Sequence, residues 1–241
     1  MVDKPALILL PGTLCDASLF VHQVEHLAGI SDCIVGDVSQ FDTLAAVADD
    51  ILRMAPQRFA LAGLSYGGIV ALEMVRRAPG RITHLALLNT NPRAASPETI
   101  ARQQRFAGMA VLGEFREITT DFLKDTMLHP DHQRDLELRR RVLAMAEHIG
   151  AQGFINQVRA QLARPDSLPD LHHILCPTLV LAGREDMVCP VALHEDMAQR
   201  IPHARLVIVE HCGHLSTLEQ PEIVTAALRD WLTGAGIWQV A

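Results

Sequence analysis

Short apolar runs alternate with helical segments along the N-terminal part of this chain. Mainly apolar runs occupy positions 6–10, 33–35, 59–62 and 82–88, and turn-forming or polar residues follow them. Apolar runs bounded by turn signals are typical of strands that are buried on both faces, as in a parallel sheet. Helical spacing, for example over 43–54, predicts helices between these strands. The pattern therefore indicates an α/β protein with a parallel sheet and helices on both faces.

The strand signals stop near residue 91 and return after residue 169. Between these positions the spacing predicts only helices, over residues 97–111, 115–127, 131–149 and 154–162. Two further strands are expected at residues 178–183 and 204–209. We therefore expect a core domain made of residues 1–91 and 169–241, with residues 92–168 inserted in it as a helical segment.

A strand signal leads directly into residues 63–68, which read Gly-Leu-Ser-Tyr-Gly-Gly and open a helix. A serine in such a sharp turn is held in a strained backbone and presents its hydroxyl at the end of the sheet. Gly63 and Gly67 remove side chains that would collide there, and Gly68 lets the helix and strand approach closely. This context favours a nucleophilic Ser65 over an ordinary turn serine.

An acid and a base follow the last two predicted strands, in the order that a serine nucleophile needs. Asp186 lies just past the first of these strands and His214 just past the second, before a helix over 216–231. Parallel strands deliver such residues to one edge of the sheet. A histidine can take the proton of the Ser65 hydroxyl, and a carboxylate can orient the imidazole and stabilise its cation. The chain thus predicts a catalytic triad of Ser65, Asp186 and His214.

With these segments the chain resembles the α/β-hydrolase superfamily. The likeness rests on the serine motif and on three further stretches: Leu-Ala-Gly-Arg-Glu-Asp at 181–186, Gly-His at 213–214 followed by Glu-Gln-Pro-Glu at 219–222, and Leu-Leu-Pro-Gly at 9–12. It covers nearly the whole chain. It implies the same triad, and it implies that residues 92–168 form a cap that excludes water and shapes the acyl pocket. It does not specify the substrate.

The chain departs from this family at its start, because only ten residues precede Pro11. Most members place an antiparallel hairpin of two strands there. We therefore predict a reduced sheet of about six strands, all parallel, which lacks the N-terminal antiparallel hairpin. One edge of that sheet would be less covered.

Acyl transfer also needs donors aimed at the developing oxyanion. One expected donor is the backbone N–H of Tyr66, at the start of the helix after the serine, where the helix dipole adds a favourable field. By resemblance, the second is the backbone N–H of Thr13. Many relatives have His-Gly where this chain has Pro11-Gly12. The proline keeps the turn but lacks an imidazole.

Neighbouring residues compete for the roles of acid and base. Glu185 is a rival acid, and Asp186 is alternatively the cap of a helix that starts near Pro190. His211 is a rival base, but His214 follows a glycine and lies deeper in its loop, as in the family. Some relatives carry their acid after the preceding strand. Here that position holds Asn89 and no carboxylate, which strengthens the case for Asp186.

Composition limits the classes of protein to which the chain can belong. Its 241 residues suffice for one domain with a sizeable core, and 49% of them are hydrophobic although only 4% are aromatic. The net charge is −7. The densest basic cluster, residues 139–141, is typical of a solvated helix face, so no nucleic-acid partner is expected. No leader or membrane-spanning segment is recognised, and we expect a cytoplasmic protein without membrane contact.

The cysteines raise the question of a metal site, and the methionines of the cap raise the question of an apolar pocket. The chain has five widely spaced cysteines, an odd number typical of reduced thiols: Cys15, Cys33, Cys176, Cys189 and Cys212. Three of them fall on loops near the triad, but no pair among them and His211 has the local spacing that zinc sites favour. We expect no metal and no cofactor. Met109, Met127 and Met145 either line an adaptable apolar pocket or pack between cap helices.

The predicted function is a serine hydrolase that acts on a small-molecule ester or related acyl substrate through an acyl-enzyme intermediate. Carbon–carbon bond hydrolases, enol-lactone hydrolases and cofactor-free perhydrolases resemble the chain equally well. For a diacid-like substrate of the first class, Arg164 and Arg184 are candidate contacts. Haloalkane dehalogenases use Asp where this chain has Ser65 and are disfavoured. A slow-turnover ligand receptor is the alternative from another class, and the oligomeric state is not predicted.

Overall fold

Six parallel strands form one sheet in the computed structural model, which describes residues 4–122 and 127–235. The strands are β1 (Ala6–Leu10), β2 (Asp32–Val35), β3 (Phe59–Leu64), β4 (Ile82–Leu88), β5 (Thr178–Gly183) and β6 (Ala204–Val209). Their order across the sheet is β2-β1-β3-β4-β5-β6, and every neighbouring pair is parallel. The prediction of a six-stranded sheet without an antiparallel pair is confirmed.

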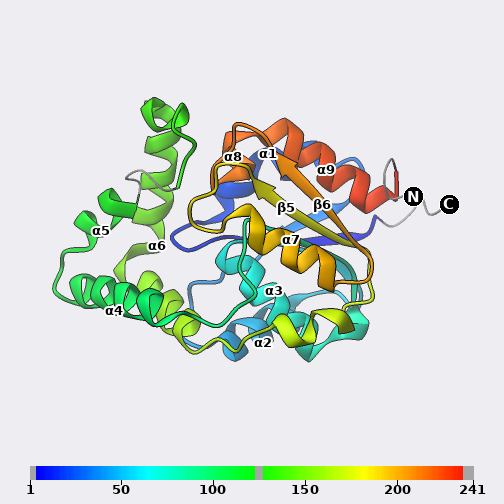
Figure 1. Ribbon diagram of the computed structural model, residues 1–241, viewed down its shortest axis with the longest axis horizontal. Coiled ribbons are helices and arrows are strands. Elements are labelled where there is room, and N and C mark those ends of the chain that lie inside the picture. The colour runs from blue at the N-terminus through cyan, green and yellow to red at the C-terminus, as the bar shows by residue number, and fades with distance from the viewer. Residues whose placement is uncertain (1–3, 123–126, 236–241) are drawn as a thin grey trace.

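Alternate side chains of the strands feed two separate apolar cores, one on each face of the sheet. Leu7 and Leu9 of β1 belong to the core under α1 (Val21–Leu27) and α9 (Pro221–Thr233). Ile8 and Leu10 belong to the core on the opposite face. The helices that cover this second face are α2 (Leu44–Met54), α3 (Tyr66–Arg77) and α7 (Val191–Arg200). Figure 1 shows the two helical layers with the sheet between them. The period of two along each strand produces this division.

In the described residues between β4 and β5, where the sequence predicts only helices, there are three α-helices. They are α4 (Pro97–Val111), α5 (Phe115–Phe122) and α6 (Leu136–Leu162). Figure 1 shows them in green to one side of the sheet, next to the ends of the strands that carry the loops. The predicted helix over 115–127 is described as far as Phe122, and residues 123–126 lie outside the described part of the chain.

The helix α6 begins later than the sequence predicts and breaks where the sequence predicts. The helix begins at Leu136 and not at residue 131, because the Asp135 side chain accepts hydrogen bonds from the N–H groups of Glu137 and Leu138 and caps it there. Two separate helices were expected on either side of Gly150, and this break is confirmed. Gly150 has a non-helical φ of 69° and ψ of 175°, a conformation that a residue with a Cβ tolerates poorly, so α6 consists of two helical pieces.

The last predicted helix, over 216–231, is divided into two pieces. The first is α8 (Ser216–Glu219) and the second is α9. Gln220 between them has φ −135° and ψ 59°, which is not helical, since the residue before a proline is disfavoured in the α region. Short helical turns such as Ala17–Phe20 and the helix α1 are absent from the prediction. In the described ranges, no helix has both the length and the apolar character that crossing a bilayer requires.

Candidate active site

Ser65 occupies the turn between β3 and α3, with a backbone φ of 55° and ψ of −116°. This left-handed φ is strained for a residue with a side chain. Two glycines make the turn possible. A Cβ on Gly63 would lie 2.2 Å from the carbonyl oxygen of Gly67, and a Cβ on Gly67 would lie 2.0 Å from that of Leu10. As predicted, a larger residue at either glycine would collide with the backbone of this turn.

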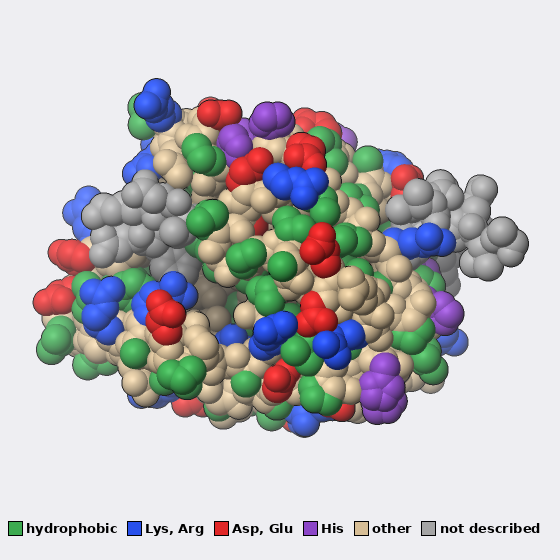
Figure 2. Space-filling view, in the orientation of Figure 1, with side chains coloured by type: hydrophobic (Ala, Val, Ile, Leu, Met, Phe, Trp, Pro, Cys, Tyr) green, Lys and Arg blue, Asp and Glu red, His purple; other side chains and the backbone are tan. Residues whose placement is uncertain are grey.

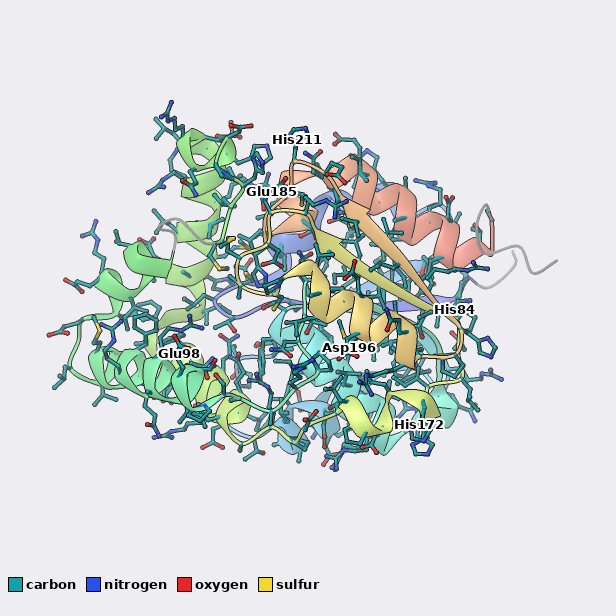
Figure 3. All side chains as sticks on the ribbon, in the orientation of Figure 1. His84, Glu98, His172, Glu185, Asp196 and His211 are labelled. Carbon is teal, nitrogen blue, oxygen red and sulfur yellow. The ribbon has the colours of Figure 1, made fainter. Side chains whose placement is uncertain are left out.

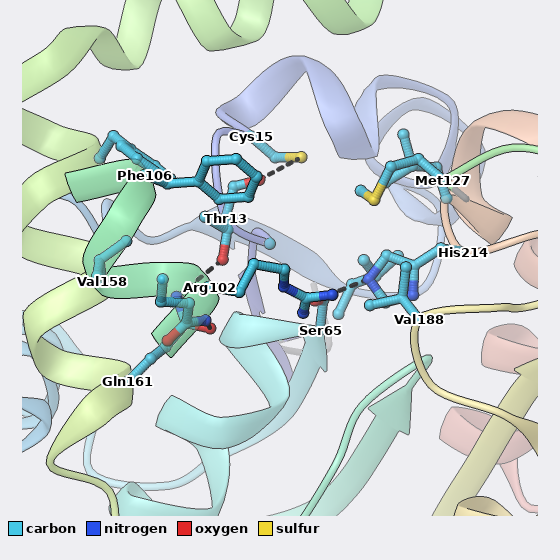
Figure 4. A pocket seen from close by; sticks show the side chains of 15 residues that line it. Thr13, Cys15, Ser65, Arg102, Phe106, Met127, Val158, Gln161, Val188 and His214 are labelled. Carbon is cyan, nitrogen blue, oxygen red and sulfur yellow. Dashed lines mark hydrogen bonds between the residues drawn. The ribbon is translucent and has the colours of Figure 1, made fainter. Parts of the chain in front are cut away.

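The structure brings the three predicted residues into one hydrogen-bonded chain. His214 Nε2 lies 2.8 Å from Ser65 Oγ, and His214 Nδ1 lies 2.8 Å from Asp186 Oδ2 (Figure 4 shows the first contact). His214 and Asp186 are buried, whereas Ser65 is partly exposed toward a cavity. A neutral His214 can then donate from Nδ1 to the carboxylate and accept the hydroxyl proton at Nε2.

Asp186 is held as a carboxylate by four partners. Its Oδ1 accepts hydrogen bonds from the N–H groups of Val188 and Cys189, both at 2.8 Å. Its Oδ2 accepts from His214 and from Asn89 Nδ2, the latter at 2.9 Å. Burial by itself raises the pKa of Asp186, but these partners outweigh it and hold the pKa below its usual value. The group is therefore ionised at neutral pH.

The rival acid and base point elsewhere. Glu185 Oε2 accepts a hydrogen bond from the Cys212 N–H at 3.0 Å. His211 is exposed, and its ring packs edge-on against the ring of His129. The alternative of Asp186 as the cap of the next helix does not hold, since Pro190 is the N-cap of α7 and makes no side-chain bond to it. Asp186 instead caps the short turn that precedes α7, where it accepts the N–H groups of Val188 and Cys189.

Of the two predicted oxyanion donors, Tyr66 directly follows Ser65 and Thr13 lines the cavity at Ser65. Tyr66 is the first residue of α3, where a backbone N–H has no acceptor within the helix. Thr13 lines the same cavity as Ser65, and a Cβ on its neighbour Gly12 would lie 3.3 Å from Ser65 Cβ. The Thr13 hydroxyl accepts a hydrogen bond from Gln161 Nε2 at 3.0 Å (Figure 4).

A cavity of about 590 Å³, including solvent at its mouth, opens above Ser65 and His214. Residues of α4 and α6 line it together with the strand-end loops; they include Arg102, Gln103, Phe106, Phe154, Val158 and Gln161 (Figure 4). Of the three methionines considered from the sequence, Met127 lines this cavity. Met145 is buried in the core under α1 and α9, and Met109 packs against a small core within the inserted helices. Core packing is therefore the correct interpretation for those two.

The arginine candidates from the sequence were wrong. Arg164 is buried and donates hydrogen bonds to the carbonyl oxygens of Arg93 and Gln161, and Arg184 is paired with Glu210 at the surface. Neither lines the cavity, whereas Arg102 of α4 does. The thiol of Cys15 also lines it, but burial and the neighbouring Asp16 raise its pKa to about 12. Cys15 is therefore protonated at neutral pH and is no rival nucleophile.

Comparison with known proteins supports the same superfamily over almost the whole chain. The model of the Alpha/beta hydrolase family matches residues 7–227. The chain belongs to this family.

Two relatives of this hydrolase have different names within the same family, one an esterase and the other a lactonase. It is 27% identical to a pimeloyl-[acyl-carrier protein] methyl ester esterase of Aromatoleum aromaticum, over 83% of this chain and 84% of the relative. It is 24% identical to 3-oxoadipate enol-lactonase 2 of Acinetobacter baylyi, over 94% and 88%. Among solved structures, a thermophilic esterase from Thermogutta terrifontis superposes with a TM-score of 0.89 at 28% identity, covering 96% of this chain and 90% of that one.

Sequence reasoning missed several residues that support the site of this hydrolase. Asn89 was noted only because it is not a carboxylate, yet it donates to Asp186 Oδ2 and to the carbonyl oxygen of Gly213. Its φ of 46°, a conformation in which Asn is enriched, directs it there. Gln157 and Arg102 approach the site from helices far along the chain. No local motif marks either of them, so the sequence alone carried no signal for their role.

Proposed function

We propose that this hydrolase cleaves small-molecule esters through an acyl-enzyme intermediate formed on Ser65. The observation that carries the proposal is the continuous pair of 2.8 Å contacts from Ser65 through His214 to Asp186. These contacts place a base on the nucleophile and an ionised orienting acid on the base. The esterases and lactonases among the relatives act on bonds of the same class.

In the first half-reaction, Ser65 Oγ attacks the ester carbonyl carbon while His214 Nε2 takes the hydroxyl proton. The oxyanion that forms accepts hydrogen bonds from the backbone N–H groups of Thr13 and Tyr66. The bond to the leaving oxygen then breaks, and His214 donates its proton to the alcohol. In the second half-reaction, His214 takes a proton from water, the hydroxide attacks the acyl carbon, and Ser65 recovers its proton as the acid leaves.

We further propose that residues 92–168 act as a cap over this chemistry. Side chains of α4 and α6 line the cavity opposite Ser65, and the contact of Gln161 with Thr13 joins α6 to the oxyanion loop. A cap of this kind excludes water from the oxyanion and determines which acyl groups fit.

A second candidate function uses the same triad on a lactone that carries a carboxylate. The observation that favours it is Arg102, a cation lining the cavity beside Ser65. A carboxylate at the far end of the acyl group would pair with it.

The experiment that tests the proposal is hydrolysis of p-nitrophenyl esters from acetate to decanoate by the wild type and Ser65→Ala. We expect sustained turnover in the wild type and a loss of at least about 10⁴-fold in kcat in the variant. Ser18→Ala, an exposed serine, is the matched control and should keep full activity. A burst without turnover would support a ligand receptor, and turnover only on lactones would support the second candidate.

A further inference from the structure

A second cluster of metal-ligating side chains lies beside the triad but outside the substrate cavity. It consists of His129, Asp131 and His211, and one possible ligand atom from each lies within 4.8 Å of the other two. His129 and Asp131 belong to the segment before α6, and His211 belongs to the loop after β6. The side chain of His129 is only 9% exposed, whereas those of Asp131 and His211 reach solvent. The cluster is therefore anchored in the protein on one side and accessible to an ion on the other.

The ring nitrogen Nδ1 of His129 is unprotonated and lies next to the Asp131 carboxylate. It accepts the Asp131 backbone N–H at 3.2 Å, a long hydrogen bond that a metal ion at this nitrogen would replace. The same atom lies 3.6 Å from Asp131 Oδ2. Two ligands of a tetrahedral zinc ion lie about 3.4 Å apart when each bond is about 2.0–2.1 Å long. The spacing of this nitrogen and oxygen is therefore already close to that of a coordinated pair.

The other ring nitrogen of His129 faces a carboxylate. Its Nε2 lies 3.8 Å from Glu185 Oε2, and Glu185 is fixed by the hydrogen bond that it accepts from the Cys212 N–H. Metal-bound histidines usually donate their second ring N–H to a carboxylate or carbonyl, which fixes the ring and raises its basicity. Figure 3 shows Glu185 and His211 at the same end of the molecule, on separate loops.

Negative charge surrounds this cluster. Besides Asp131 and Glu185, the carboxylate of Glu219 lies nearby, where it accepts the His129 backbone N–H at 2.7 Å and contacts His132 Nδ1 at 2.9 Å. Figure 2 shows histidine and acidic side chains close together along the top edge of the view. Such a field favours a cation over an anion at this position.

We propose that His129, Asp131 and His211 bind a divalent transition-metal ion, with Zn²⁺ as the ion that suits them. Two imidazole nitrogens and one carboxylate oxygen are a common zinc donor set, with water in the fourth position. The sequence has no local zinc spacing among its cysteines and His211, and no metal was expected. The cluster lacks such a spacing because its two histidines are distant in the chain and meet only in the folded protein.

The ion would connect the segment before α6 to the loop that carries the catalytic base. The two are already in contact, since the His214 N–H donates to the carbonyl oxygen of Met127 at 3.0 Å. A Cβ on Gly213 would lie 2.6 Å from the backbone nitrogen of His129, so the two segments pack closely. Because Met127 lines the cavity, the ion would fix one wall of the substrate site as well as stabilise the folded chain.

Isothermal titration of the chelator-treated protein with ZnCl₂ alone tests this proposal without any substrate. We expect one ion per chain, and a rise in Tm of about 5–10 °C at free zinc about 100 times Kd. Loss of an outer-shell partner costs about 10- to 100-fold in metal affinity, and loss of a ligand should cost at least as much. His211→Asn and Asp131→Asn should therefore each weaken binding by at least about tenfold. Both sites are exposed, and Asn tolerates the φ of 52° at position 211, so folding should be preserved.

Two controls separate this site from other zinc-binding positions. The stacked pair His22 and His26 is a surface alternative, and His26→Asn should leave the tight site intact. The second alternative is the triad itself, where Asp186, Cys189 and His214 also form a possible ligand cluster, and zinc bound there would be kept in His211→Asn and Asp131→Asn. No binding by the wild type, or tight binding kept in both His211→Asn and Asp131→Asn, would overturn the proposal. Because binding is read directly, neither result depends on ester hydrolysis.

Discussion

The side-chain oxygen Oε1 of Gln157 accepts a hydrogen bond from the backbone N–H of Leu14 at 3.0 Å. This contact joins α6, which begins far along the chain, to the loop after β1. Leu14 has a φ of 59°, a strained conformation for a side chain of this size. A strained loop keeps its shape only when its surroundings hold it. Gln157 therefore helps to hold the loop in which Thr13 is the proposed oxyanion donor.

Replacing Gln157 with Leu should lower kcat for ester hydrolysis by about tenfold, with little change in KM. The substitution leaves the buried Leu14 N–H without an acceptor, a penalty of about 1–3 kcal/mol that the loop can escape by moving. Steady-state kinetics on the preferred p-nitrophenyl ester measures the effect. Gln152→Leu, at an exposed position of the same helix, is the control. An unchanged kcat in Gln157→Leu would show that the loop holds its shape without this bond.

Replacing Asn89 with Asp should reduce activity near neutral pH and move the acid limb of the pH profile to higher pH. Asn89 Nδ2 lies 2.9 Å from Asp186 Oδ2, so the variant would place two carboxyl groups in contact. Like charges raise the pKa of such a pair, and one proton would then be shared between them. The pH dependence of kcat/KM measures this. Asn91→Asp, on the same loop, should leave the profile in place, and an identical profile in Asn89→Asp would contradict the prediction.

His194 should make the protein less stable as the pH falls below neutrality. Its Nε2 accepts the Thr90 N–H at 3.0 Å, and burial lowers its pKa from 6.5 to about 4. The unfolded chain therefore binds more protons than the folded chain between these pH values, and the free energy of unfolding decreases as the pH falls through them. From pH 7 to pH 5 the decrease from this group is about 2 kcal/mol.

Urea unfolding of the wild type and of His194→Gln at pH 7 and pH 5 tests this prediction. Glutamine keeps an acceptor for Thr90 but does not titrate, so the variant should lose about 2 kcal/mol less between the two pH values. His26→Gln, an exposed histidine, should behave as the wild type does. Equal losses in all three proteins would mean that His194 titrates normally in the fold.

Arg102→Gln should raise KM by about 5- to 10-fold for p-nitrophenyl monoesters of dicarboxylic acids. It should leave KM for neutral esters of similar length nearly unchanged, because only the charged acyl group pairs with the guanidinium. The exposed position of Arg102 keeps the effect moderate. Arg105→Gln, one turn along α4 and stacked on Phe106, controls for a general loss of positive charge. Equal KM changes for charged and neutral esters would count against a carboxylate contact.

The sequence by itself predicted the parallel sheet, which the structure confirms, and the three residues proposed as the triad. Each of these depends on local signals: apolar runs that must be buried on both faces, glycines that only a tight turn requires, and polar residues directly after strand ends. Parallel strands then bring Ser65, Asp186 and His214 to one edge whatever the details of packing. The turn after β3 also predicts Tyr66 as an oxyanion donor, whereas Thr13 is predicted only from the family resemblance.

Only the tertiary structure decided which side chains surround these residues. Gln157, Arg102 and Asn89 reach the site through the packing of α6 and α4 over the sheet and through one backbone conformation after β4. The spacing predicts the break at Gly150, but it does not give the relative position of the two helical pieces on either side. The cluster of His129, Asp131 and His211 likewise combines two distant segments. Contacts between residues far apart in the chain depend on the relative position of whole elements, which no local pattern encodes.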